Sequence, residues 1–159
     1  MADALKLAAA QKVYQLVCAA IDERGWNYDK DDTDLVIRFG VHGNDIPVHH
    51  VIVVDAERQL LRMMSPLPFE MAEDKRTEGA IVTNVASMGL RDGNFDYDVF
   101  TGRILFRATA SFYGSEIGKG MIHYLIDCVN AVVDHYNDRF EAVNSGKMSV
   151  QEFIDLEKR

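Results

Sequence analysis

The segment from Asn94 to Thr109, NFDYDVFTGRILFRAT, constrains the fold of this 159-residue chain more than any other part of its sequence. Two runs that alternate apolar and polar residues flank Thr101 and Gly102, which suit a tight turn. With that turn, the facing pairs are Phe95 with Ala108, Tyr97 with Phe106, Val99 with Ile104 and, on the other face, Asp96 with Arg107. A one-residue slip would bring the apolar side of one strand against the charged side of the other. The pattern therefore predicts an antiparallel hairpin packed on a core.

The rest of the chain reads as helices and short strands, since helical spacing of apolar residues predicts the former and alternation the latter. The expected helices cover residues 4–24, 72–90 and 115–143, and the expected strands before the hairpin cover residues 35–41, 47–54 and 59–64. The acidic segment 28–34 is expected to be a loop. Ser65–Pro68 is expected to be a connector, because its prolines cannot continue a strand ladder. Ser149 and Glu152 have capping-box spacing, which predicts a short terminal helix.

This order, α-βββ-α-ββ-α with a short C-terminal helix, predicts the fold class α+β. Adjacent strands joined by short turns form antiparallel meanders, so we expect a sheet of about five strands with helices on one face or at its ends. Residues 1–159 are expected to form a single α+β domain, with 146–159 as a terminal helical extension. That extension can dock on its own domain or on a partner. Because the strands do not alternate one for one with helices, a doubly wound nucleotide-binding sheet is disfavoured.

The net charge of -8, without any run of Lys or Arg, limits the partners of this chain. It repels phosphate backbones and anionic lipid headgroups, so we expect no nucleic-acid partner and no membrane role. No stretch approaches the roughly 18 apolar residues of a membrane span, and Lys6 and Lys12 interrupt the apolar start, which is expected to remain in the mature protein. Cys18 and Cys128 lie in apolar helical patterns without a CxxC pair, as is typical of free thiols in a reducing cytosol. We therefore expect a soluble cytoplasmic protein.

No motif has the spacing that its chemistry needs. The acidic alternation at the start of the hairpin is not an EF-hand loop, because Tyr97 and Arg103 stand where glycine and an acidic ligand are required. The glycines of segment 114–120 lie too close together for a phosphate-binding P-loop. His49 and His50 point to opposite faces of a strand, so at most one could join a shared metal site. The sequence thus predicts no catalytic residues, no cofactor and no metal, and we expect the protein not to be an enzyme.

Two apolar features remain. The helix at 115–143 has a wider apolar stripe than one sheet face usually covers, so it either crosses the centre of the core or meets another chain. Around the connector, methionines and other adaptable apolar side chains either bind partners or close one end of the core. The candidate protein-binding residues are Ile122, Ile126, Val129, Val133, Tyr136 and Phe140 on the helix, and Met63, Met64, Leu67, Phe69 and Met71 around the connector.

Four features together resemble the YbjN family, a family of candidate regulators of bacterial sensory transduction. They are the order of elements, the proline-containing connector, Asn84 within the helix at 72–90, and the hairpin FDYDVFTGRILFR. The resemblance covers roughly residues 4–143. It implies a fold similar to that of class I type III secretion chaperones. It also implies a small acidic cytoplasmic protein that is often dimeric and works by binding other proteins.

The leading hypothesis is therefore a non-enzymatic protein-binding, chaperone-like or regulatory module of YbjN type. It would act through apolar surfaces as a homodimer with a protein or peptide client. The alternative is a small-molecule-binding protein or enzyme with a pocket between sheet and helices, involving His49, Arg38 or Arg107. A deep pocket where ionisable side chains converge would favour the alternative, whereas a groove-like apolar surface would favour the leading hypothesis.

Overall fold

The computed structural model describes residues 3–158, which form four α-helices and a six-stranded antiparallel sheet. The helices are α1 (Ala4–Glu23), α2 (Arg76–Met88), α3 (Lys119–Asn144) and α4 (Val150–Glu157), with a short 3₁₀ turn, η1 (Glu73–Lys75), before α2. The strands are β1 (Asp29–Asp31), β2 (Val36–His42), β3 (Pro47–Asp55), β4 (Leu60–Glu70), β5 (Asn94–Asp98) and β6 (Arg103–Ser111). Their order in the sheet is β1-β2-β3-β4-β6-β5. The predicted α+β class and antiparallel pairing are confirmed.

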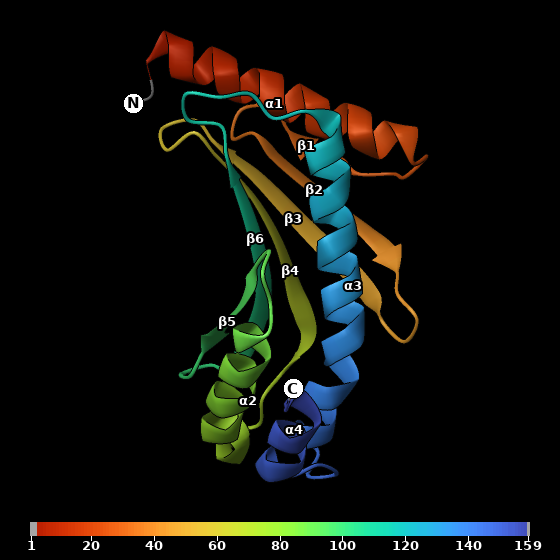
Figure 1. Cartoon of the computed structure of the whole chain (residues 1–159). Coiled ribbons are helices and arrows are strands. Elements are labelled where there is room, and N and C mark those ends of the chain that lie inside the picture. The colour runs from red at the N-terminus through yellow and green to blue at the C-terminus, as the bar shows by residue number, and fades with distance from the viewer. Residues whose placement is uncertain (1–2, 159) are drawn as a thin grey trace.

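The helices gather on one face and at the two ends of the sheet. In Figure 1, α3 crosses the face of the sheet that is turned to the viewer, and α1 lies across the upper end. Helices α2 and α4 pack side by side at the lower end. Several polar contacts join the end of α1 to α3, among them Arg24 to Asp127 at 2.7 Å and Glu23 to His123 at 3.0 Å.

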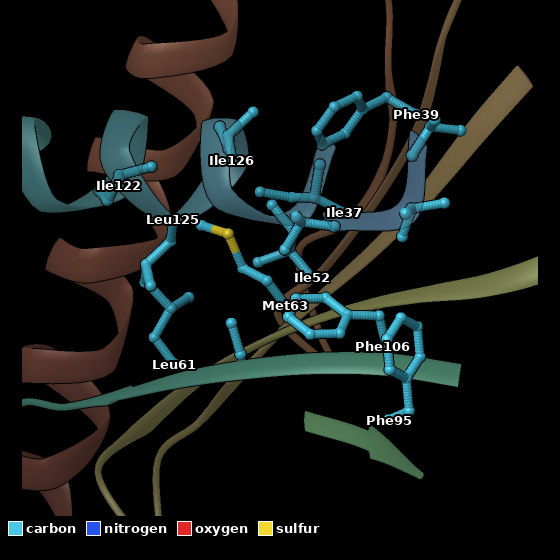
Figure 2. Close-up of a cluster of buried hydrophobic side chains, with 14 of the residues drawn as sticks. Ile37, Phe39, Ile52, Leu61, Met63, Phe95, Phe106, Ile122, Leu125 and Ile126 are labelled. Atoms are coloured by element: carbon cyan, nitrogen blue, oxygen red, sulfur yellow. The ribbon is translucent and has the colours of Figure 1, made fainter. Parts of the chain in front are cut away.

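The core lies between α3 and the sheet. Figure 2 shows Ile122 and Ile126 of α3 beside Ile37, Ile52 and Met63 of the sheet, and all five side chains are fully buried. Burying such aliphatic side chains stabilises the fold by about 1.5–3 kcal/mol each, as an upper estimate. The wide apolar stripe of α3 therefore crosses the centre of the core, which was one of its two possible explanations.

The terminal helix α4 docks on its own chain. Ser149 and Glu152 form the predicted capping box, with the Ser149 hydroxyl accepting from the Glu152 backbone N–H and the Glu152 carboxylate accepting from the Ser149 backbone N–H. Phe153 is fully buried and stacks on Phe140 of α3, with 5.8 Å between ring centroids. The Tyr136 hydroxyl donates to the Glu157 carboxylate at 2.8 Å. Residues in the middle and at the C-terminal end of α4 thus attach it to α3.

Strand β1 occupies a segment that the sequence predicts to be a loop. It pairs with β2 through Asp31 opposite Val36, and the turn between them is closed by the Asp31 carboxylate, which accepts from the backbone N–H groups of Thr33 and Asp34. Leu35 completes the turn with a positive φ of 53°. Short charged strands are common at sheet edges, where they discourage pairing with other chains. The acidic composition that suggested a loop is therefore compatible with an edge strand.

The predicted connector is also wrong, because β4 continues through both of its prolines. Pairing with β3 ends at Met64, so the part of β4 that follows has only β6 as a neighbour. Pro66 lies opposite Leu105, and the register then shifts before Glu70. Proline is tolerated at a sheet edge or a bulge, where its missing N–H removes no ladder bond. The prolines therefore lie where the pairing of β4 with β3 has ended, rather than where β4 itself ends.

The predicted hairpin exists as β5 and β6, with its register shifted by two residues. The observed facing pairs are Asn94 with Arg107, Phe95 with Phe106, Asp96 with Leu105, Tyr97 with Ile104 and Asp98 with Arg103. The loop is longer than predicted, because the Asp98 carboxylate accepts from the Phe100 backbone N–H and the Thr101 hydroxyl. A two-residue shift leaves every side chain on the same face, so alternation does not detect it. The predicted Asp96–Arg107 ion pair forms between diagonal neighbours, with 2.6 Å between Arg107 Nε and Asp96 Oδ2.

Replacing Gly102 by Ala should destabilise the fold by about 2 kcal/mol or more. Its φ of +82° costs an L-residue roughly 1–2 kcal/mol, and a Cβ would overlap with the backbone carbonyl oxygen of Met71. Gly146→Ala is the matched control, because Gly146 has a φ of +76° and open space around it. Urea denaturation of both variants separates the two causes. Equal losses of stability would contradict the close approach of the Gly102 loop to Met71.

Candidate protein-binding face

The structure places the six candidate residues of the long helix in the core rather than on a surface. Ile122, Ile126, Val129, Val133, Tyr136 and Phe140 are each at most 4% exposed. Their side chains pack on the sheet and α4, as the ring contacts of Phe140 with Phe95 and Phe153 show. The prediction that these six residues form a binding surface of the folded chain is therefore wrong. Another protein could reach them only after α3 had left the sheet.

The candidates around the connector divide between core and surface. Met63 and Met71 are buried, whereas Met64 and Phe69 are half-buried. Leu67 is only 7% exposed, yet it lines a surface hollow together with Phe69. Alternation along β4 explains the difference between Met63 and Met64, because successive side chains of a strand point to opposite faces of the sheet, whereas Phe69 lies in the stretch where the register shifts.

We call the face of the sheet opposite α3 the open face. Its central residues alternate with the core positions and are half-buried or exposed, as expected for an antiparallel sheet with one face covered. They are Val36 and Arg38 on β2, Val51 and Val53 on β3, Arg62 and Met64 on β4, and Leu105, Arg107 and Thr109 on β6. The residues of β3 and several around it are aliphatic, so apolar side chains meet solvent here.

A hollow of about 800 Å³ lies at one end of this face, where the register shift separates β4 from β6. It is lined by residues of β4, β5 and β6: Pro66, Leu67, Pro68, Phe69, Glu70, Asp96, Tyr97, Asp98, Arg103, Ile104 and Leu105. The pairing places Leu105 in the middle, with Pro66 on one side and Asp96 on the other. We refer to it as the β4–β6 hollow. It is an open groove with a mainly apolar floor.

The charged residues at the rim of the hollow form ion pairs with one another. Arg103 bonds Glu70 at 2.9 Å, and Arg107 makes two bonds to Asp96, at 2.6 and 3.0 Å. The hydrogen bonds from Arg107 hold the pKa of Asp96 below its ordinary value, although partial burial acts in the opposite direction. These groups can frame a bound side chain, and the lowered pKa of Asp96 keeps it ionised at neutral pH rather than able to act as an acid catalyst.

The residues considered for a small-molecule pocket do not meet between sheet and helices. Arg38, His49 and Arg107 all lie on the open face. His50 points to the face opposite His49, as the strand pattern predicts, and this face is the core: its ring stacks on Phe39 at 4.4 Å and contacts the Asn130 side chain at 2.7 Å. Burial lowers the pKa of His50 to about 4, so it is neutral at physiological pH.

Sequence patterns missed two residues of this face. Arg62 lies between Leu61 and Met63, both fully buried, and its place on a central strand gives it a half-buried position on the open face. Leu105 lies at the centre of the hollow, but nothing in its sequence context distinguishes it from the other apolar residues of the hairpin. For Arg62 there was a signal, because an arginine between two core positions of a strand must lie on the opposite face of the sheet.

Residues 3–158 contain no cluster of three or more His, Cys, Asp or Glu side chains able to hold a metal ion. Within the same residues, every helix is too short or too polar to cross a membrane.

Comparison with known proteins identifies the fold. No protein-family model and no curated protein matches this sequence. Among solved structures, the chain is similar to the crystal structure of YbjN from E. coli, a candidate transcription regulator. The TM-score is 0.60 with 9% sequence identity, over 84% of this chain and 92% of that one. At this identity the similarity shows the fold alone. The chain therefore has a YbjN-like α+β fold, as its resemblance to that family implied.

Proposed function

We propose that this chain is a non-enzymatic protein-binding module, chaperone-like or regulatory in role, that holds an apolar side chain of its partner in the β4–β6 hollow. The observation that carries the proposal is the hollow itself. At about 800 Å³ it is larger than four other hollows on the described residues, which measure about 360 to 590 Å³, and it includes Leu67 and Phe69 from the predicted binding segment. Exposed apolar grooves of this kind are typical of protein interaction sites.

Two properties favour a protein partner over a small substrate. The hollow is open along the sheet surface, whereas small-molecule sites enclose most of their ligand. Arg103 in the hollow is paired with Glu70, and Arg107 beside it with Asp96, so these guanidinium groups can position a partner. A YbjN-like fold is consistent with a regulatory or binding role. The homodimer and the cytoplasmic location expected from the sequence stay predictions.

Replacing Leu105 by Glu should abolish partner binding. Leu105 is on the open face, so a carboxylate there fills the hollow with charge without entering the core. Met88→Glu is the matched control, because Met88 is an apolar side chain, 81% exposed, on α2. Immobilised wild type, Leu105→Glu and Met88→Glu proteins are each incubated with native lysate, and bound proteins are compared by quantitative mass spectrometry. We expect partners common to the wild type and Met88→Glu to be depleted at least tenfold with Leu105→Glu, about 1.4 kcal/mol of binding free energy. Equal recovery by all three proteins would contradict the proposal.

A further inference from the structure

The open face carries three arginines on its central strands, Arg38 on β2, Arg62 on β4 and Arg107 on β6. Acidic residues of this face lie on the edge strands, among them Asp29 on β1 and Asp96 on β5, and at the end of β3, at Asp55. This concentration of arginine is unexpected in a chain whose net charge is -8. The surface of a chain that repels anions overall thus includes an area whose arginines attract them.

Two of these arginines have no acceptor in the part of the chain that the structure describes. The side chains of Arg62 and Arg38 make no hydrogen bond and no ion pair with residues 3–158, and the Nε atom of Arg62 is buried without a partner. Arg107 differs, because Asp96 already holds it with two bonds. A buried unsatisfied donor costs about 1–3 kcal/mol, so Arg62 gains most from an added acceptor.

The unpaired arginines are continuous with the β4–β6 hollow. Val53 lies beside Arg62, and Val51 lies between Arg38 and Met64 in the sheet register. Met64 is two residues before Pro66, which lines the hollow. A chain that places an apolar side chain in the hollow and extends toward β2 would therefore pass over aliphatic side chains and reach Arg62 and then Arg38.

We propose that the partner segment bound at the hollow is acidic, with carboxylates that pair with Arg62 and Arg38 while apolar side chains between them cover Val51, Val53 and Met64. The inference rests on the proposed function and adds the chemistry of the partner. Arginine and carboxylate form charge-assisted hydrogen bonds, and the half-buried position of Arg62 reduces their screening by water. Phosphates of a nucleic acid also suit arginine, but the net charge and the acidic edge strands repel a polyanion.

The test uses displayed random dodecapeptides selected on the immobilised full chain. Selected sequences are made as free peptides, and their affinity is measured by calorimetry against wild type, Arg62→Gln and Arg38→Gln. Arg58→Gln is the matched control, because Arg58 is an exposed arginine in the turn between β3 and β4. We expect enrichment of Asp and Glu beside Leu or Phe. We also expect affinity to fall by about 10-fold to 100-fold with Arg62→Gln, and less with the exposed Arg38→Gln, and to stay unchanged with Arg58→Gln.

The other outcomes separate this inference from the proposed function. Peptides without acidic enrichment, weakened by Leu105→Glu but not by the arginine variants, would overturn the acidic partner and leave the hollow as a binding site. A failure to select any peptide, or binding insensitive to Leu105→Glu and both arginine variants, would count against both. A fluorescent single-stranded oligonucleotide that binds wild type and loses affinity with Arg62→Gln would overturn the choice of a protein partner. Thermal denaturation of each variant checks folding, and the exposed Arg38 gives a result even if Arg62→Gln unfolds.

Discussion

Phe140→Ala is expected to lower the free energy of unfolding by about 3–5 kcal/mol, the usual cost of removing a fully buried phenylalanine. Phe140 is the centre of an aromatic cluster that joins α3, β5 and α4. Its ring lies 4.9 Å from Phe95, 5.7 Å from Tyr136 and 5.8 Å from Phe153. Small domains are stable by only about 5–15 kcal/mol, so this single change removes a large fraction of the total.

Urea denaturation followed by circular dichroism measures the loss. Phe100→Ala is the matched control, because Phe100 is 85% exposed in the β5–β6 loop and its removal should change stability by less than about 0.5 kcal/mol. If both variants lost a similar, small amount of stability, α4 would not be held to α3 through Phe140, and the described core would be wrong at this end of the molecule.

Acidification from pH 6.5 to pH 4 is expected to remove about 3 kcal/mol of stability through His50 alone. Burial lowers the pKa of His50 from 6.5 to about 4, and positive charge on His49 and Arg24 acts in the same direction. The unfolded chain therefore takes up a proton below pH 6.5, whereas the folded chain does so only near pH 4. The contribution is complete above pH 6.5 and decreases as the pH falls, by about 1.4 kcal/mol for each unit.

This effect is isolated by measuring the unfolding free energies of wild type and His50→Gln in urea between pH 7 and pH 4.5. Both proteins contain the same carboxylates, so the contribution of the carboxylates to the pH dependence cancels in the difference. Glutamine does not titrate and keeps a polar group near Asn130. We expect the wild type to lose stability relative to His50→Gln as the pH falls. A difference between wild type and His50→Gln that does not change with pH would mean that His50 is accessible to protons.

Much of the fold was predictable because alternation and helical spacing report burial directly. The hairpin, the capping box at Ser149 and the assignment of His49 and His50 to opposite faces all follow from such local patterns. The two errors in strand assignment arose where local chemistry suggested a loop. Proline at positions 66 and 68 and the acidic segment containing β1 are both compatible with strands at a sheet edge. Which strand forms an edge depends on the pairing of the whole sheet.

The candidate site was less predictable than the fold. An apolar stripe on a helix has the same sequence whether it packs on a sheet or on another chain, so Ile126 and Phe140 could not be assigned to the core in advance. The hollow depends on the register shift between Pro66 and Glu70, which has no local signature. Leu67 and Phe69 were identified for their adaptable apolar character, while the arginines became informative only once four strands placed them on one face.

Photo-crosslinking tests the central claim, that the β4–β6 hollow receives a protein partner, most directly. A photoreactive benzophenone amino acid is placed at position 105 in the hollow or at position 88 on α2, and each protein is irradiated in native lysate. The account predicts that position 105 gives discrete adducts with another protein and that unmodified chain added in excess competes them away. Adducts at position 88 and none at position 105 would contradict it.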